Sequence, residues 1–391
     1  MNVAVIGAGA AGCFCAIALR RLLPDCAVTV YEAGPRPLRK VAVTGGGRCN
    51  LTNSFEGITR LQEAYPRGWQ LMKRALGAFS AADTQAWFER EGVRLVTQPD
   101  GCVFPRSQDA MEIVRTLLRL MDRLGVEVRC NSKIGDIRTL EADAVVVTTG
   151  GGALQLLEGS GVAIEPPVPS LFTFNLGDDP VRTLAGTVVE NASAALAGTR
   201  FRASGPLLVT DWGMSGPAIL KLSSYGARYL SEQGYRAQLL VSWLGAQPDA
   251  EVRGRLETLL MENPRKQLSS VHPQELTARL WQHLLEKSGV RGDLRCAEAG
   301  PRSLSRLTEI LQRDPYSVCG KSRFKEEFVT CGGVSLGDVN LQTLESKSRP
   351  GLFFAGEVLD VDAITGGFNL QAAWSTAMLA ARGIASKTEK T

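Results

Sequence analysis

The sequence is poor in the residues that most often bind metals or build catalytic triads. Its 391 residues include only two histidines, His272 and His283. A histidine-based metal site or triad is therefore nearly excluded. The nine cysteines are odd in number and scattered, and no two of them form a C-x-x-C pair. Reduced thiols, buried as small apolar side chains, are the ordinary interpretation of such cysteines.

The sequence also has only a small excess of positive charge and lacks long apolar runs. The 44 basic and 40 acidic residues leave a net charge of +4, which by itself indicates neither a nucleic-acid nor a membrane partner. No apolar run reaches the roughly 18 residues that a membrane-spanning helix needs. The apolar N-terminus lacks the preceding basic residue of a signal peptide. We therefore expect a cytoplasmic protein that binds neither a membrane nor nucleic acid. The oligomeric state stays open.

The N-terminus carries a dinucleotide-binding pattern. An apolar strand at residues 3–6, a glycine-rich turn, a helix and a second strand at 28–31 follow one another. Such glycines permit a tight turn, let the backbone approach a pyrophosphate and let the helix pack close to the strand. The helix N-terminus offers free N–H groups to phosphates, and a carboxylate about 20 residues later accepts hydrogen bonds from the ribose. The candidate contacts are Gly7, Gly9, Ala10, Ala11, Gly12 and Glu32.

Later glycine-rich segments identify the dinucleotide as FAD, bound non-covalently. An NAD domain of about 150 residues needs no return of the chain at its far end, whereas a long cofactor lying across the sheet does. We expect Glu357 to bind the ribityl chain, and the last helix to stabilise negative charge on the reduced flavin. The alternative is that these glycines only form turns. The candidates are Thr149, Gly150, Gly151, Gly356, Glu357, Asp360, Gly366, Gly367, Phe368, Asn369 and Leu370.

Residues 43–53 read VTGGGRCNLTN and resemble the signature of a bacterial family of three-domain flavoproteins. That family includes BaiN-type bile-acid enone reductases and L-aminoacetone oxidases. Segments 100–105, 214–218, 330–334 and 356–371 are similar to it as well. The short loop at 152–164 and Asp211, which stands where the family usually has a histidine, depart from the pattern, so no substrate is carried over.

The resemblance implies an α/β fold, in which a Rossmann-type FAD-binding domain is interrupted by a β-rich domain carrying a helical insert. We assign residues 1–169 and 324–391 to the FAD domain. Residues 170–245 and 314–323 form the β-rich domain, and 246–313 the helical insert. We also expect an amphipathic helix over 106–124 and a return of strand structure near Phe328.

The glycine-rich loop of the signature supplies further candidates with two possible roles each. Arg48 binds the pyrophosphate or flavin edge, or it supports the fold. Asn50 is expected to hydrogen-bond the flavin or the loop rather than to catalyse proton transfer. Asp360 and Asp362 help to bind the ribityl chain, or they cap a turn. A redox role for Cys49 is disfavoured, because it has no C-x-x-C partner. Ile134 is the candidate for recognising adenine through its main chain. The loop candidates are Gly46, Gly47, Arg48, Cys49 and Asn50.

The expected function is an FAD-dependent oxidoreductase acting on a small or medium organic substrate. Reduction of a conjugated C=C bond with NAD(P)H and oxidation of an amine with oxygen both stay open. No second G-x-G-x-x-G exists, so NADH or NADPH would dock transiently, or electrons come directly from the substrate. A flavin-containing RNA-modifying or RNA-binding protein is the alternative, disfavoured by the weak net charge. A non-enzymatic redox sensor is a third hypothesis. No catalytic residue can be named.

Overall fold

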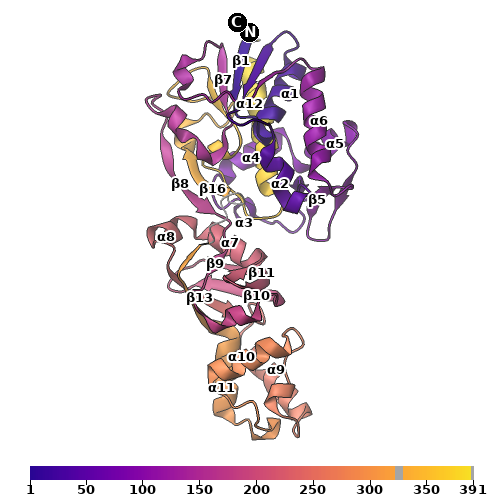
Figure 1. Cartoon of the computed structure of the whole chain (residues 1–391), viewed down its shortest axis with the longest axis vertical. Coiled ribbons are helices and arrows are strands. Elements are labelled where there is room, and N and C mark those ends of the chain that lie inside the picture. Colours follow the sequence, from indigo (N-terminus) through magenta and orange to yellow (C-terminus); the bar gives the residue numbers. More distant parts are fainter. Residues whose placement is uncertain (322–328, 389–391) are drawn as a thin grey trace. The chain divides into compact units, whose positions relative to one another are not determined.

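The computed structural model describes residues 1–321 and 329–388. The chain divides into two compact units (Figure 1), Met1–Pro169 with Glu326–Thr391 and Ser170–Lys325. The first unit contains a parallel Rossmann-type sheet and the second an antiparallel sheet, which confirms the predicted fold class. The expected boundary at 323–324 and the strand expected near Phe328 lie outside the described residues. The finer division into a β-rich domain and a helical insert stays a prediction.

The first unit is organised around a five-stranded sheet in which every pair is parallel. The N-terminal strand lies at its centre and is almost wholly buried, as strands covered on both faces are. The C-terminal part of the chain returns to add the edge strand next to residues 144–147. The order is β17 (Leu352–Phe354), β7 (Ala144–Val147), β1 (Asn2–Ile6), β2 (Ala27–Tyr31) and β6 (Glu127–Arg129).

Two helices from opposite ends of the chain pack together in this unit, α1 (Ala10–Leu22) and α12 (Phe368–Thr388). Small side chains on both helices permit the approach. Phe14 of α1 fills the remaining space, with its ring centroid 4.8 Å from that of Trp87 and 5.4 Å from that of Trp374. The two chain ends therefore share one apolar core.

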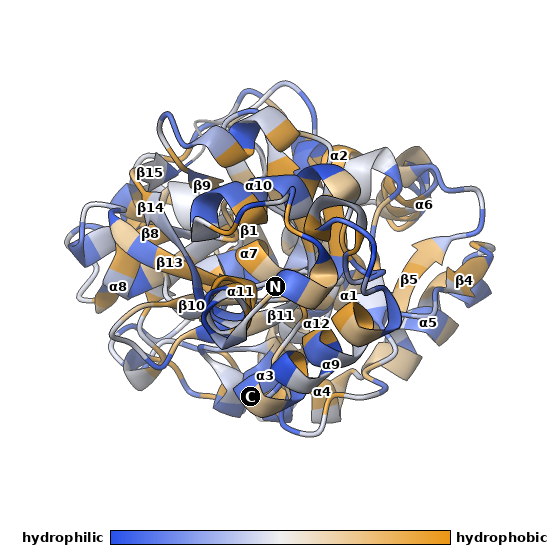
Figure 2. Cartoon of the chain, turned by 90° about the horizontal axis from the view of Figure 1, so that it is seen from below, coloured by the Kyte–Doolittle hydropathy of each residue, from blue (hydrophilic) through white to orange (hydrophobic). Residues whose placement is uncertain are grey.

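The amphipathic helix expected over 106–124 is α6 (Ala110–Arg123). It begins later than expected because Asp109 accepts a hydrogen bond from the Met111 N–H and caps it at this point. The other helices of the unit are α2 (Arg39–Gly47), α3 (Leu61–Ala64), α4 (Trp69–Ala78) and α5 (Ala81–Arg90). A small sheet contains β3 (Thr52–Asn53), β5 (Cys102–Pro105) and β4 (Leu95–Thr97), and β16 (Val329–Val334) pairs with β8 (Ile164–Ser170). Strand β5 is buried throughout and is drawn as hydrophobic in Figure 2.

The second unit has a seven-stranded sheet in which each pair of neighbours is antiparallel. Its order is β14 (Asp314–Val318), β13 (Ala237–Ser242), β10 (Val188–Leu196), β11 (Arg202–Thr210), β12 (Gly213–Ser215), β9 (Phe174–Asn175) and β15 (Gly320–Lys321). Its helices are α7 (Pro217–Tyr225), α8 (Ala227–Glu232), α9 (Asp249–Glu262), α10 (Ala278–Ser288) and α11 (Pro301–Arg313). Among the described residues, no helix is both long and apolar enough to cross a membrane.

A buried ion pair joins helix α10 to the antiparallel sheet. The Asp314 carboxylate is fully buried and lies 2.5 Å from the Lys287 Nζ. Trp243 Nε1 donates to it at 2.9 Å, and the Tyr316 hydroxyl donates to the same oxygen. Burial raises the pKa of Asp314, even though Lys287 and the two donors oppose the shift. The carboxylate therefore depends on all three partners.

Replacement of Lys287 by methionine should destabilise the second unit. The variant leaves Asp314 buried without its cation, and breaking a buried pair costs on the order of 3–5 kcal/mol. Urea unfolding followed by tryptophan fluorescence measures the loss, with the exposed Lys73→Met as the control. An unchanged urea midpoint for Lys287→Met would show that the pair contributes no net stability.

Candidate dinucleotide-binding site

The turn between β1 and α1 has room for only glycine at two of its three glycine positions. Gly7 has φ +103°, and a Cβ atom there would lie 2.8 Å from the carbonyl oxygen of Thr148. A Cβ atom on Gly12 would overlap the carbonyl oxygen of Gly7. A Cβ atom on Gly9, by contrast, would meet nothing within 4 Å. Gly7 and Gly12 thus permit close packing, whereas Gly9 faces open space in which a ligand has room.

The positive charge at the start of helix α1 is not compensated by any side chain of its cap or first turn. Gly9 is its N-cap, no side chain caps the helix, and its first turn contains no acidic residue. The N–H groups of Ala10 and Ala11 therefore have no side-chain acceptor there, and the positive end of the helix dipole is not neutralised. This is the arrangement that binds phosphate groups at helix N-termini.

Glu32 holds the same turn from the end of β2. One carboxylate oxygen accepts the Ala8 N–H at 2.9 Å, and the other accepts the Gly34 N–H at 2.7 Å. The sequence predicted a carboxylate at this point but not its bonds to the protein backbone. Each carboxylate oxygen has a further lone pair, so Glu32 can shape the turn and still accept a ribose hydroxyl.

Ile134, the candidate for adenine recognition, is half-buried and follows a segment bonded to the Glu32 loop. The Asn131 N–H donates to the Gly34 carbonyl at 2.9 Å, and the Ser132 N–H donates to the Glu32 carbonyl at 2.8 Å. These bonds place the segment before Ile134 next to the end of β2.

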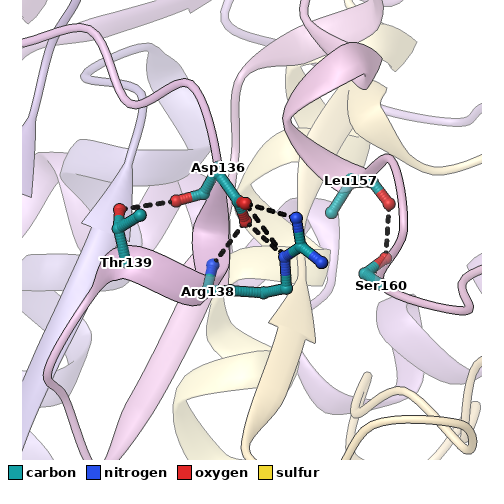
Figure 3. Close-up of polar contacts among 5 residues, drawn as sticks. All are labelled: Asp136, Arg138, Thr139, Leu157 and Ser160. Carbon is teal, nitrogen blue, oxygen red and sulfur yellow. Dashed lines mark hydrogen bonds and ion pairs between the residues drawn. The ribbon is translucent and has the colours of Figure 1, made fainter.

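A braced turn follows Ile134 (Figure 3). Asp136 accepts the Arg138 N–H at 2.8 Å and pairs with the guanidinium of the same residue at 2.6 Å. The Thr139 hydroxyl donates to the Asp136 carbonyl at 2.8 Å. The Arg138 side chain and N–H lower the pKa of Asp136 to about 2, so the Asp136 carboxylate is ionised at neutral pH. In the loop shown beside it, the Ser160 hydroxyl donates to the Leu157 carbonyl at 2.6 Å.

Three glycines in succession turn the chain at the end of α2. Gly45, Gly46 and Gly47 have φ values of +58°, +68° and +82°, a region that side chains other than glycine rarely adopt. Cβ atoms on Gly46 and Gly47 would meet nothing within 4 Å, so this loop also faces open space. Arg48 supports the loop: its Nε donates to the Gly45 carbonyl at 3.1 Å, and its guanidinium lies 4.6 Å from the Phe104 ring centroid.

The Cys49 thiol is fully buried. Burial raises its pKa to about 12, so it stays protonated at neutral pH. A protonated thiol is neither a nucleophile nor a redox centre, and only the backbone of Cys49 is left to contact a cofactor.

Residues 50–53 are bonded to the start of α12. In the orientation that satisfies its amide, Asn50 donates to the Thr52 carbonyl at 3.0 Å and accepts the Gly367 N–H at 3.2 Å. The Asn53 amide donates to the Gly366 carbonyl at 2.9 Å. A Cβ atom on Gly367 would overlap the Thr52 carbonyl, which explains why glycine stands there. Asn50 thus fulfils the loop-supporting alternative of its two expected roles.

Asn369 also directs its side chain at the protein. Its amide oxygen accepts the Ala363 N–H at 2.9 Å, and its amide nitrogen donates to the Ala363 carbonyl at 3.1 Å. The neighbouring Phe368 carbonyl accepts a hydrogen bond from the Tyr65 hydroxyl at 2.9 Å, and Leu370 is half-buried. The backbone of this segment is therefore rigidly placed.

Glu357 lies where three distant segments meet. One of its carboxylate oxygens accepts the Thr330 N–H at 2.9 Å, and the other lies 3.2 Å from the Lys40 Nζ. A Cβ atom on Gly150 would lie 3.3 Å from Glu357, and one on Gly151 would overlap the Thr330 side chain. The segment after Thr149 is thus brought to Glu357.

Lys40 is a residue that the sequence analysis missed. Its partner Glu357 lies 317 residues away, and nothing in the local pattern around Lys40 indicates the pair. A cation at this point offsets the carboxylate charge, which would otherwise repel the phosphates of a dinucleotide.

The two aspartates that follow Glu357, Asp360 and Asp362, differ in burial. Asp362 is fully buried and is bound through both oxygens by the Arg67 guanidinium, so its carboxylate is not available to bind a ribityl chain. Asp360 is half-buried, and its N–H donates to the Val334 carbonyl at 3.0 Å.

Comparison with known proteins identifies the family. A family model described as "HI0933-like protein Rossmann domain" matches residues 1–383. The chain belongs to the HI0933-like family. This confirms the resemblance seen in the sequence.

Two relatives of this HI0933-like chain match it along nearly their whole length. A 3-dehydro-bile acid delta(4,6)-reductase of Clostridium scindens is 29% identical over 99% of each chain. A ribosomal RNA dihydrouridine synthase of Haemophilus influenzae is 28% identical over 97% of each chain. The second name means that the expected absence of a nucleic-acid partner is not supported.

A solved structure shows the same fold at low identity. The 3-ketosteroid delta1-dehydrogenase of Sterolibacterium denitrificans aligns with a TM-score of 0.52 at 12% identity, over 98% of this chain and 99% of that one. At such an identity the likeness concerns the fold alone.

The thiols should differ sharply in reactivity. At pH 8, iodoacetamide should label the exposed Cys319 of the native protein and leave Cys49 unmodified, because the reactive thiolate is suppressed by burial. Mass spectrometry of peptides reads the labelling, and the protein unfolded in guanidinium serves as the control. Labelling of Cys49 as fast as Cys319 in the native state would contradict its burial.

Glu32→Ala should weaken FAD binding by about 10- to 100-fold, since hydrogen bonds to a charged group are worth about 1.5–3 kcal/mol. Titration of the apoprotein with FAD, followed by flavin fluorescence, gives the dissociation constant. Glu127→Ala is the matched control, because Glu127 lies on a strand of the same sheet and its side chain bonds Arg129 and Thr29 rather than the glycine-rich turn. Equal FAD affinity for Glu32→Ala and wild type would reduce Glu32 to a structural residue.

Proposed function

We propose that the protein is an FAD-dependent oxidoreductase that reduces a C=C bond conjugated to a carbonyl group. The observation that carries the proposal is the convergence of four segments in the first unit. The open helix end at Gly9, the Glu32 carboxylate, the glycines at 46–47 and the Glu357 segment are joined by the contacts described above. Together they offer donors and acceptors for a pyrophosphate, a ribose and a ribityl chain.

The hydrogen-bonding groups of the site match both the adenosine half and the flavin half of FAD. Residues 9–12 would receive the pyrophosphate at the positive end of α1, Glu32 the adenosine ribose, and the backbone at Ile134 the adenine. Glu357, with its charge offset by Lys40, would accept ribityl hydroxyls. Bound FAD would supply the two-electron redox chemistry of the reaction.

The start of α12 would favour the reduced state of the cofactor. Its first turn contains no acidic residue, and the glycines at 366–367 precede it with positive φ values. The partial positive charge of a helix N-terminus stabilises an anion nearby, by up to about 2 kcal/mol when partly buried. Asn50, Asn53 and Tyr65 hold this backbone in place, so the stabilisation needs no reorganisation when electrons arrive.

The type of reaction is favoured by what the two relatives have in common. A delta(4,6)-reductase of a 3-dehydro-bile acid and a dihydrouridine synthase each add hydrogen across a C=C bond conjugated to a carbonyl group. Their substrates differ, so the type of reaction is what the two relatives share, and it supports the proposal. A nicotinamide would be the reductant: the C=C–C=O substrate, NAD(P)H and a proton give the saturated carbonyl compound and NAD(P)⁺.

The two open questions are the electron donor and the substrate. The sequence has only one dinucleotide motif, so NADH or NADPH would dock transiently beside the flavin. Oxidation of an amine with oxygen is the alternative within the same class. A steroid-like enone and a uracil ring in RNA are the candidate substrates, and the second unit, which contains none of the FAD motifs, would select between them.

Anaerobic spectroscopy tests this function directly. NADH or NADPH should bleach the flavin band near ~450 nm, and a 3-oxo-Δ4 steroid or a uridine-containing RNA should restore it, with the saturated product detected by mass spectrometry. Saturated analogues of the same compounds are the control acceptors. Bleaching by primary amines without nicotinamide, and no reoxidation by any conjugated C=C compound, would contradict the proposal.

A further inference from the structure

Positive charge is concentrated at one end of the helical part of the second unit. We call residues 263–272 and 289–306 the basic tip. It contains two acidic residues, Asp293 and Glu298, against six basic ones: Arg265, Lys266, Arg291, Arg295, Arg302 and Arg306. The tip therefore has a net charge of +4, equal to that of the whole chain, and the remainder of the protein is balanced.

Backbone hydrogen bonds hold the two segments of the basic tip side by side. The Leu268 N–H donates to the Leu294 carbonyl at 2.9 Å, and the Cys296 N–H donates to the Lys266 carbonyl at 2.9 Å. An antiparallel bridge pairs Gln267 with Arg295. The cations of both segments therefore belong to one rigid surface, although they are separated along the sequence.

The cations of the tip are exposed, and most are not neutralised. Arg291 is paired with Asp293 at 2.6 Å, and the Glu298 carboxylate accepts the backbone N–H of Arg295 at 3.0 Å. No ion pair involves Arg265, Lys266 or Arg302 in the part of the chain that the structure describes. Concentrating uncompensated like charges raises the local potential and attracts a polyanion.

The N-terminus of helix α11 adds a second source of positive charge to the tip. Its N-cap is Gly300, no side chain caps it, and its first turn contains Arg302 but no acidic residue. A cation beside the positive end of a helix is unfavourable on its own, whereas an anion bound there is stabilised by both. This arrangement fits a phosphate group.

We infer that the basic tip binds the phosphate backbone of RNA. The choice of RNA rests on the proposed function, since uracil is the RNA base whose C5=C6 bond is conjugated to a carbonyl group. Binding to a membrane surface would require exposed apolar side chains among the cations. Of the large hydrophobic side chains exposed in the described chain, one, Met261, lies beside the tip in sequence, two residues before its first segment, and none lies within either segment.

The salt dependence of binding follows from the number of phosphate contacts. Arg265, Lys266, Arg295 and Arg302 provide about four contacts, so log K should fall with log[salt] with a slope of about −3 on single-stranded RNA. Removal of three of these cations should reduce the slope by about 2 and lower the affinity by at least about 10-fold at low salt.

Fluorescence anisotropy of the FAD-loaded full chain with a labelled uridine-containing RNA, between ~50 and ~200 mM salt, measures both quantities. The test variant is Arg265→Ala/Lys266→Ala/Arg302→Ala. The matched control is Lys73→Ala/Arg74→Ala/Arg94→Ala, which removes three exposed cations of the first unit. The test variant should lose binding and keep its FAD, whereas the control should bind RNA like the wild type.

Three results would overturn the inference: no RNA binding at ~50 mM salt, equal losses in the two triple variants, or binding of anionic vesicles but not of RNA. Flavin bleaching by NADH or NADPH, and reoxidation by the steroid or by the uridine-containing RNA, measured on the same samples, report the proposed function separately. Enone reduction by a wild-type chain that binds no RNA would therefore refute the role of the basic tip alone. Failure of the redox assay with intact, tip-dependent RNA binding would refute the proposed reaction alone.

Discussion

The close approach of backbone to backbone around the first turn is the constraint on which the first unit depends. Gly12 lies against the Gly7 carbonyl, Gly7 against Thr148, and a Cβ atom on Gly356 would lie 2.7 Å from that of Ala11. Each contact excludes a side chain at the glycine, so the segments after β1, after β7 and after β17 approach one another closely. The N–H groups and carboxylates of three distant segments are thereby gathered at one end of a rigid parallel sheet, where open α/β folds bind their ligands.

The local signals in the sequence predicted the fold class and the family well. The strand, glycine turn, helix and Glu32 lie within about 30 residues, so their spacing alone specifies the turn. Long-range partners could not be predicted in this way. Lys40 meets Glu357 and Arg67 meets Asp362 only because the last part of the chain returns to the first sheet. Likewise, Asn50 and Asn369 have the chemistry of ligands, but their side chains bond the protein backbone.

The net charge of a whole chain does not report how its charges are distributed, and the expected absence of a nucleic-acid partner is not supported. A value of +4 spread over 391 residues indicates nothing, whereas the same charge confined to the basic tip produces a strong local potential. The redox site and the basic tip lie in different units and are chemically independent. Under the proposed function, the second unit would select between a small enone and RNA, and the first unit would keep the same cofactor site.

Identification of the bound cofactor tests the central claim most directly. The purified protein should be yellow, and acid precipitation should release FAD, identified by chromatography and mass, at close to one molecule per chain. The open helix end at Gly9 and the Glu32 carboxylate serve the adenosine half that distinguishes FAD from FMN. Release of FMN, flavin that stays with the denatured chain, or a colourless protein that does not bind added FAD would contradict the claim.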